Sequence, residues 1–307
     1  MQTTVIVNPK SGKLSGAHSW AAIEPRLREA IGPFDAALTQ ATGGATALAR
    51  EALRRGAERV VAVGGDGTLS EVVNGFFDGR AAINPAAVFS FLMCGTGNDF
   101  QKTLGRPASL DESLNALRQP REKLIDVGRL TYVGHDGLPR EQHFLNIASC
   151  GMGGAVDRYV NAIPLRGLWG GKASFLAATL IALLVFRNKR VRLVIDDQPP
   201  RETRVRVAVV ANGRFAGGGM MFAPHAELDD GLFDIVLLEN VSRIQAVRHM
   251  PKIYAGRHLD LDQVVYLRGR RVEATSDEEV LLDIDGEAPG RLPATFEIVP
   301  QALRIQY

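Results

Sequence analysis

The chain has 307 residues, and its 36 basic and 34 acidic side chains leave a formal net charge of +2. Hydrophobic residues make up 46% and charged residues 23%, which excludes a disordered chain and a strongly basic nucleic-acid-binding protein. The 32 glycines follow no repeat, so we expect them in tight turns. Two cysteines, Cys94 and Cys150, cannot build a disulfide framework.

The N-terminus lacks the basic start and apolar core of a signal peptide. The longest apolar run, residues 173–186, is shorter than the roughly 20 residues that span a bilayer. These features predict a soluble, cytoplasmic protein without a transmembrane segment.

The first 125 residues alternate between apolar runs typical of buried strands and segments in which apolar residues have helical spacing. Strands are expected at 5–7, 34–38, 59–63 and 87–93, and helices at 20–31, 42–56 and 69–76. This alternation predicts an open, mostly parallel α/β sheet of the Rossmann-like, three-layer kind. Ligands of such sheets bind beyond the carboxyl ends of the strands.

After residue 126, short β-like runs separated by turn signals dominate. Strands are expected at 127–133, 142–148, 191–195, 205–210, 233–238, 264–267, 280–284 and 296–299. Two helices interrupt them, near 171–187 and 242–254. We therefore expect an α/β domain over 1–125 and a mainly antiparallel β-sandwich domain over 126–292, with 293–307 returning to the first domain.

Two glycine-rich turns follow consecutive strands of the first domain. The first, GGDGT at 64–68, opens a helix, where backbone N–H groups can approach phosphate oxygens. Asp66 would repel phosphate unless a cation or hydroxyl stands between them, which indicates a contact with Mg²⁺-nucleotide or ribose. The alternative is a tight turn with Asp66 near the helix N-cap. The second turn, GTGNDF at 95–100, faces the same crevice, and neither turn fits the Walker or dinucleotide fingerprint.

Taken together, the motifs resemble the diacylglycerol kinase catalytic family, and most closely its soluble bacterial lipid kinases. The matching segments are NPKSG at 8–12, GGDGT at 64–68 with Glu71 and Asn74, GTGNDF at 95–100, NIASCGMG at 146–153, NG at 212–213 with GGG at 217–219, APHAELDDGLFD at 223–234, and DGE at 285–287. They cover almost the whole chain in the family's order. The resemblance implies a fold of the NAD kinase and diacylglycerol kinase type.

The resemblance also implies the ligands and the residues that bind them. ATP would be lined by Asn8, Ser11, Thr39, Gly64, Gly65, Asp66, Gly67, Thr68, Leu69, Ser70 and Thr96. A structural Mg²⁺ would be held by the Asp230 carboxylate and the backbone oxygens of Glu227 and Leu232, and Asp66 would contact the Mg²⁺ of the nucleotide. From spacing alone, an ordinary hairpin turn would be the favoured interpretation of the Asp-Asp-Gly segment.

The DGE segment matches the family's catalytic turn. A kinase needs a carboxylate near the attacking hydroxyl, and Glu287 is the first choice for this base. Asp285 is the alternative base or an orienting partner. Without the resemblance, a solvated hairpin turn would be the favoured interpretation.

The implied activity is ATP-dependent phosphorylation of a lipid primary hydroxyl, with diacylglycerol as the first choice of substrate. Three alternatives stay open: another lipid acceptor (phosphatidylglycerol, or a sphingoid or ceramide-like lipid), an NAD kinase-like enzyme, and a regulator that binds nucleotide without catalysis. The apolar run and the basic residues at 187–192 suit transient membrane association, although a buried helix explains them as well. A homodimer is a further expectation.

Overall fold

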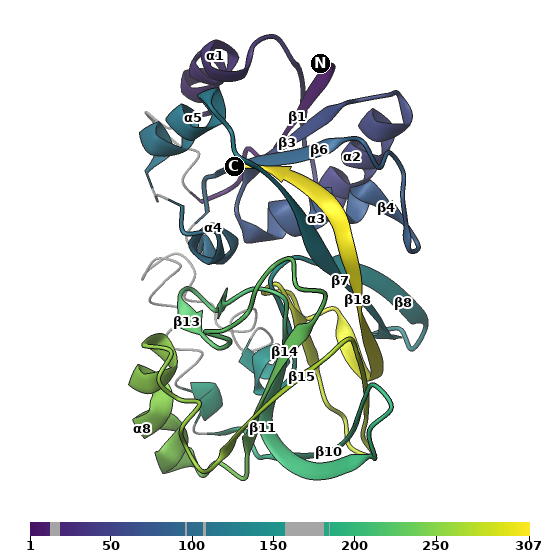
Figure 1. The fold of residues 1–307 in the computed structure, drawn as a ribbon, viewed down its shortest axis with the longest axis vertical. Helices are drawn as coiled ribbons and strands as arrows, with labels where there is room; N and C mark the ends of the chain where they lie inside the picture. The colour runs from purple at the N-terminus through teal and green to yellow at the C-terminus, as the bar shows by residue number, and fades with distance from the viewer. Residues whose placement is uncertain (13–18, 96, 107–108, 157–180, 184) are drawn as a thin grey trace. The chain divides into compact units, whose positions relative to one another are not determined.

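The computed structural model describes residues 1–12, 19–95, 97–106, 109–156, 181–183 and 185–307. Its contacts divide the chain into two compact units, one formed by Met1–Val127 with Val299–Tyr307 and the other by Gly128–Ile298. Two long strands, β7 (Glu122–Gly134) and β18 (Gly290–Gln306), contribute residues to both units (Figure 1). Most of the helix expected at 171–187 lies outside the described residues.

The first unit alternates strands and helices along the chain. Its further elements are β1 (Thr3–Val7), α1 (Trp20–Ile31), β2 (Asp35–Leu38), α2 (Gly44–Arg54), β3 (Arg59–Gly64), α3 (Asp66–Phe76), β4 (Phe77–Asp78), β5 (Ala81–Ala82), β6 (Val88–Met93), α4 (Asp99–Thr103) and α5 (Leu110–Arg118). The strands pair in the order β2-β1-β3-β6-β18, and every pair is parallel. The predicted parallel α/β sheet is confirmed.

The sequences of the central strands explain their place in this sheet. Every residue of β3 and of β6 is buried, as expected for parallel strands that are covered on both faces. Helices α2 and α3 pack closely because Gly75 has no side chain: a Cβ there would lie 2.5 Å from the Ala49 Cβ. Glu71 of α3 also binds the start of α2, since its carboxylate accepts the N–H groups of Gly43 and Ala45 at 2.9 and 3.0 Å.

The second unit is built mainly from antiparallel strands, with α8 as its long described helix. Its further elements are β8 (Pro139–Phe144), β9 (Ile147–Gly151), β10 (Lys189–Ile195), β11 (Arg201–Ala211), β12 (Phe215–Ala216), β13 (Met220–Met221), β14 (Phe233–Glu239), α8 (Arg243–Tyr254), β15 (Val264–Gly269), β16 (Arg271–Thr275) and β17 (Leu282–Ile284). Within this unit all pairs, such as β11 with β14 and β10 with β16, are antiparallel. The predicted antiparallel domain is confirmed.

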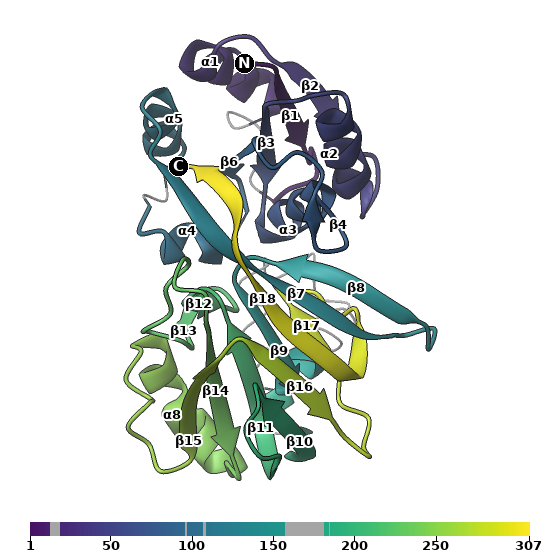
Figure 2. The same cartoon turned by 45° about the vertical axis from the view of Figure 1, so that its right-hand side comes forward.

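Alternating residues of β11 serve two separate cores. Val205, Ala208 and Val210 belong to one core, and Val207 and Val209 to the other. The second core also holds the buried face of α8, which covers this side of the sheet (Figure 2). An irregularity in the pairing of β11 with β14 between Val205 and Val207 explains why these two residues, although two apart in the strand, lie in different cores.

The strands of this unit differ from the prediction at two places. The run expected at 142–148 is divided between β8 and β9, and the backbone between them turns to donate hydrogen bonds to Asp285. Strand β16 was not predicted because its sequence, RVEAT, has only two buried residues. Its pairing with β10 and β18 places it in the sheet.

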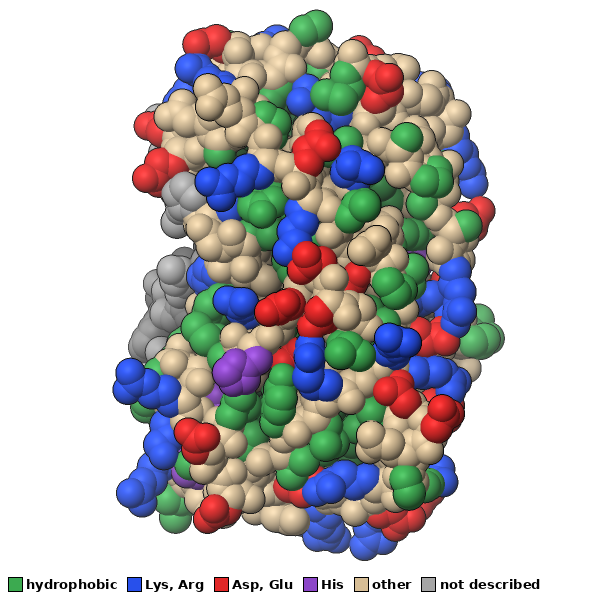
Figure 3. Space-filling model, viewed as in Figure 1, with side chains coloured by type: hydrophobic (Ala, Val, Ile, Leu, Met, Phe, Trp, Pro, Cys, Tyr) green, Lys and Arg blue, Asp and Glu red, His purple; other side chains and the backbone are tan. Residues whose placement is uncertain are grey.

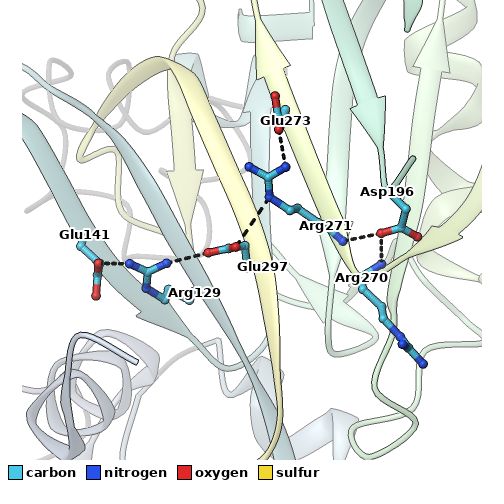
Figure 4. A network of polar contacts seen from close by, with 7 residues as sticks. All are labelled: Arg129, Glu141, Asp196, Arg270, Arg271, Glu273 and Glu297. Atoms are coloured by element: carbon cyan, nitrogen blue, oxygen red, sulfur yellow. Dashed lines mark hydrogen bonds and ion pairs between the residues drawn. The ribbon is translucent and has the colours of Figure 1, made fainter. Parts of the chain in front are cut away.

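A polar network joins four strands of the second unit (Figure 4). Arg129 of β7 pairs with Glu297 of β18, at 2.6 Å, and with Glu141 of β8. Arg271 of β16 lies 3.6 Å from the same Glu297. The network fixes the register of strands that are distant in the chain.

The imidazole of His258, fully buried beyond the end of α8, gives the second unit a pH dependence. Burial lowers the pKa of His258, and its Nε2 lies 3.0 Å from the Phe222 carbonyl oxygen. The unfolded chain therefore takes up the proton more readily, and the free energy of unfolding decreases as the pH falls below about 6.5. In His258→Gln this part of the acid destabilisation should be lost. Denaturant titrations at pH 7.5 and pH 5 measure it, and exposed His225→Gln should keep it.

In the part of the chain that the structure describes, we find no helix with the length and apolar character needed to cross a membrane.

Candidate active site

One candidate site, in the first unit, lies at the carboxyl ends of β1, β3 and β6. The Asn8 side chain donates to the Thr68 hydroxyl oxygen at 3.1 Å, which joins the turn after β1 to the start of α3. The Ser11 hydroxyl donates to the Cys94 carbonyl oxygen at 3.3 Å, at the end of β6. Thr39 follows β2, and its N–H donates to Val7 at 2.9 Å. The strand order thus brings together four turns that the sequence motifs singled out.

The carboxylate of Asp66 ties the two glycine-rich turns together. One oxygen accepts the N–H of Asn98 at 2.8 Å, and the other accepts the N–H groups of Asp99 and Phe100 at 3.0 and 3.5 Å. Burial raises the pKa of Asp66, with a smaller contribution from the charge of Asp99, while the three donors act in the opposite direction. The expectation that Asp66 contacts the Mg²⁺ of the nucleotide stays a prediction.

The same two turns touch through glycines. A Cβ on Gly95 would lie 2.6 Å from the Gly65 Cα, and a Cβ on Gly97 would lie 2.8 Å from an Asp66 oxygen. Only glycine allows this approach without movement of the backbone. Because α3 begins at Asp66, its first N–H groups have no acceptor within the helix and remain available for an anion.

We expect Gly95→Ala to separate the two turns. The new methyl group forces backbone atoms apart, which should lower the free energy of unfolding by about 2 kcal/mol and weaken ATP binding by at least about tenfold. Gly44→Ala is the matched control, since its Cβ would meet only the Thr39 Cβ, at an ordinary 3.8 Å. Denaturant unfolding and calorimetric titration with ATP measure both effects. Normal ATP affinity in Gly95→Ala would contradict a site at these turns.

Four further residues predicted to line the nucleotide lie in or next to the glycine-rich turns. Leu69 and Ser70 are buried, at 1% and 2% exposure, and their contact with a nucleotide stays a prediction. Thr96 lies outside the described residues. Gly64 packs beneath Thr68, whose hydroxyl would lie 2.4 Å from a Cβ on that glycine.

A second candidate site, in the other unit, is the turn after β17. Asp285 and Gly286 have φ values of 48° and 89°, and Ile284 and Glu287 form a bridge on either side. Two consecutive left-handed residues are typical of a tight hairpin turn. The Gly286 N–H also donates to Asp283 at 3.0 Å, which holds the turn from below.

Asp285 and Glu287 differ in what their side chains do. The Asp285 carboxylate accepts three consecutive backbone N–H groups, from Leu145 at 2.9 Å, Asn146 at 3.1 Å and Ile147 at 2.9 Å. This arrangement parallels that of Asp66 in the other unit. Glu287 is half-buried. Burial raises the pKa of Tyr132, and the negative charge of the nearby Glu287 adds a smaller contribution in the same direction. Glu287 is therefore the better placed of the two to act on a substrate.

Asn146 and Asn212 hold the backbone beside this turn, a role that the sequence did not reveal. The Asn212 amide donates to the Leu145 carbonyl oxygen at 2.8 Å, and its N–H donates to Asn146 at 2.9 Å. Both residues belong to motifs quoted for the resemblance, which is the signal that pointed to them.

The predicted magnesium residues lie at the start of β14. Asp230 accepts the Leu232 N–H at 3.0 Å and pairs with Arg268, which stands opposite Asp234 in the β14–β15 ladder. Asp234 is fully buried, and burial raises its pKa. One of its oxygens has no hydrogen bond, although Arg268 Nε lies 3.5 Å away.

This donor set fits Mg²⁺, because carboxylate and carbonyl oxygens are its preferred ligands and a carboxylate oxygen of Asp234 next to Asp230 lacks a hydrogen bond. No cluster of three or more acidic, His or Cys side chains with metal-binding geometry occurs among the described residues, so backbone oxygens and water would complete the shell. Arg268 pairs with the Asp230 carboxylate and would compete with a metal ion for it. The sequence did not indicate this contact, because Arg268 and Asp230 are 38 residues apart in the chain.

Both cysteines are buried, and neither forms a disulfide bond. Burial raises the pKa of the Cys150 thiol to about 12, which removes it as a nucleophile at neutral pH.

Comparison with known proteins gives consistent matches over both units. The model of the diacylglycerol kinase catalytic domain matches residues 2–130, and that of the YegS C-terminal NAD kinase beta sandwich-like domain matches residues 146–307. A Chromohalobacter salexigens protein named "Probable lipid kinase YegS-like" is 32% identical, over 93% of this chain and 86% of its own length. A Bacillus subtilis protein named diacylglycerol kinase is 28% identical, over 95% of this chain and 91% of its own.

A solved structure shows the same fold. The crystal structure of a diacylglycerol kinase from Bacillus anthracis strain Sterne has a TM-score of 0.72 and 24% identity, covering 100% of this chain and 96% of the other. The domain models, the relatives and the fold together confirm the resemblance stated from the motifs. The chain belongs to the family of bacterial diacylglycerol kinases and YegS-like lipid kinases.

Proposed function

We propose that this lipid kinase transfers the γ-phosphoryl group of ATP to the primary hydroxyl of diacylglycerol, giving phosphatidic acid and ADP. The name of the Bacillus subtilis relative supports this substrate. The observation that carries the proposal is the difference between the two acidic residues of the DGE turn. Asp285 is held by three backbone N–H groups, whereas Glu287 presents a half-buried carboxylate on a rigid turn.

We assign the nucleotide to the turns of the first unit. The N–H groups at the start of α3 and the positive end of its dipole suit the phosphates. Asn8 and Ser11 border this position, and Thr39 ends the neighbouring strand. Asp66 acts as a positioning residue, because its hydrogen bonds hold the second glycine turn against the first.

In the proposed reaction, Glu287 accepts the proton of the lipid hydroxyl as its oxygen attacks the γ-phosphorus. A new P–O bond to the lipid forms, the bond between the γ-phosphorus and the β–γ bridging oxygen breaks, and its electron pair leaves with ADP. Asp285 keeps the turn in place while this occurs. Mg²⁺ would neutralise phosphate charge, and Asp230 with the backbone oxygens of Glu227 and Leu232 would hold a structural ion.

The acceptor can be tested with a panel assay. The purified protein is incubated with γ-labelled ATP and Mg²⁺ in mixed micelles that contain diacylglycerol, phosphatidylglycerol or ceramide, and in a lipid-free reaction with NAD⁺. We expect label in phosphatidic acid at a rate well above that of every other arm. A faster reaction with another acceptor would overturn the choice of diacylglycerol. Transfer to NAD⁺ alone would overturn lipid phosphorylation.

This enzyme would meet its substrate at the membrane surface from the cytoplasm, where ATP is available. A homodimer stays a prediction.

A further inference from the structure

Helix α8 presents two different faces. Ala246 and Ile253 are buried in the core beneath it, at 4% and 6% exposure. On the opposite side, Ile244 is 82% exposed, and Val247 and Tyr254 are each 41% exposed. A helix that packs one apolar face on its own sheet gains nothing for folding from a second apolar face in water. The outer face therefore points to a role outside the folded chain.

The exposed apolar residues form a stripe. With 3.6 residues per turn, Ile244, Val247, Pro251 and Tyr254 fall within roughly 80° of the helix circumference. Five of the nine large hydrophobic side chains that are exposed in the described chain belong to α8 or to residues 181–185. The carbonyl oxygen of Leu183 and that of Val241, just before α8, both accept from the buried Arg206 guanidinium, so the two segments adjoin.

Basic side chains border this stripe on both sides. By the same helical geometry Arg243 lies on one side and Arg248 and Lys252 on the other, and all three are exposed. The segment 242–257 contains no Asp or Glu. None of the three forms an ion pair with any residue that the structure describes. Figure 3 shows several basic side chains at the lower left edge, over α8.

We propose that the outer face of α8 docks on an anionic lipid bilayer. Ile244, Val247 and Tyr254 would enter the headgroup region, and the flanking Arg and Lys side chains would face lipid phosphates. This combination of an apolar stripe, a basic border and a tyrosine at the boundary is how helices lie in a membrane interface. The inference deepens the proposed function and rests on it, because diacylglycerol resides in the bilayer.

The charge pattern favours a bilayer over a second copy of the chain. If two copies of α8 packed face to face, the basic side chains of one helix would lie near those of the other. The helix has no Asp or Glu that could offset this repulsion. An anionic bilayer supplies the missing opposite charge, and each basic side chain strengthens its attraction.

Vesicle binding tests the proposal without ATP. The full-length protein is sedimented with vesicles of phosphatidylcholine containing about one third phosphatidylglycerol, and with vesicles of phosphatidylcholine alone. We expect binding to the anionic vesicles only. Ile244→Ser with Val247→Ser, and separately Arg248→Gln with Lys252→Gln, should each weaken it about tenfold. The matched controls are Leu138→Ser, an exposed apolar residue elsewhere, and Arg54→Gln with Arg55→Gln, which should bind normally.

The outcomes separate this inference from the proposed function. Both α8 variants should phosphorylate diacylglycerol normally in neutral detergent micelles, which shows that they are folded and active. Vesicle binding by the α8 variants at the level of the controls would overturn the docking surface, as would a dimer that dissociates only in these variants. If no variant and no wild-type protein phosphorylates diacylglycerol while vesicle binding still depends on α8, the proposed function fails and the docking surface stands.

Discussion

Replacing Glu287 with Gln is expected to lower kcat for diacylglycerol phosphorylation by about 100- to 10,000-fold, the range for loss of a general base. The amide keeps the size of the side chain but cannot accept the hydroxyl proton. The turn should survive, because it is held by backbone bonds between Ile284 and Glu287 and by the Gly286 N–H on Asp283. Fold and ATP affinity are therefore expected to be unchanged.

Steady-state kinetics in mixed micelles measure this loss, and Glu279→Gln is the matched control because Glu279 is an exposed glutamate of the same unit. Asp285→Asn provides the contrast. It should mainly lower the free energy of unfolding. The NH₂ group of the asparagine would face a backbone N–H that now donates to the Asp285 carboxylate, and two donors cannot form a hydrogen bond with each other. A Glu287→Gln enzyme with full turnover, or an Asp285→Asn enzyme that is stable but inactive, would reverse the two assignments.

The second large effect is expected at Asp66. An asparagine there keeps one acceptor oxygen, but its NH₂ group would face one of the N–H donors at 98–100. Because buried N–H donors would then lack an acceptor and face a new donor, the free energy of unfolding should fall by about 2–4 kcal/mol. Because the second glycine turn is then no longer held against the first, we also expect ATP to bind at least about tenfold more weakly.

Chemical denaturation and calorimetric titration with ATP measure the two effects, with exposed Asp35→Asn as the control in the same unit. We also expect the two losses to occur together. A stable Asp66→Asn protein that loses only Mg²⁺-dependent ATP binding would instead support the sequence-based assignment of Asp66 to the metal of the nucleotide.

Much of the fold could be predicted because the signals were local. The buried strands β3 and β6 are continuous apolar runs, and the turns after them are marked by glycines, of which Gly95 is required by its contact with Gly65. The motifs also predicted the family, which the two domain models confirm, while the roles of Glu287 and Asp230 stay predictions. These features depend on residues that are close in the chain.

What could not be predicted depends on distant partners. The sequence shows Asp66 and Asp285 as carboxylates in glycine turns, but not that each accepts three N–H groups from another segment. The run at 142–148 looks like one strand until the bonds to Asp285 break it. Arg268 is a further example. Its sequence neighbours, Arg270 and Arg271, indicate only an exposed basic surface, whereas the pairing of β14 with β15 places Arg268 next to Asp230.

The most direct test of the central claim is the product balance of a single reaction of the wild-type protein with ATP and diacylglycerol, followed by ³¹P NMR. The account predicts that one molecule of phosphatidic acid appears for each ADP, without free phosphate. Formation of ADP and inorganic phosphate with no phosphorylated lipid would contradict it.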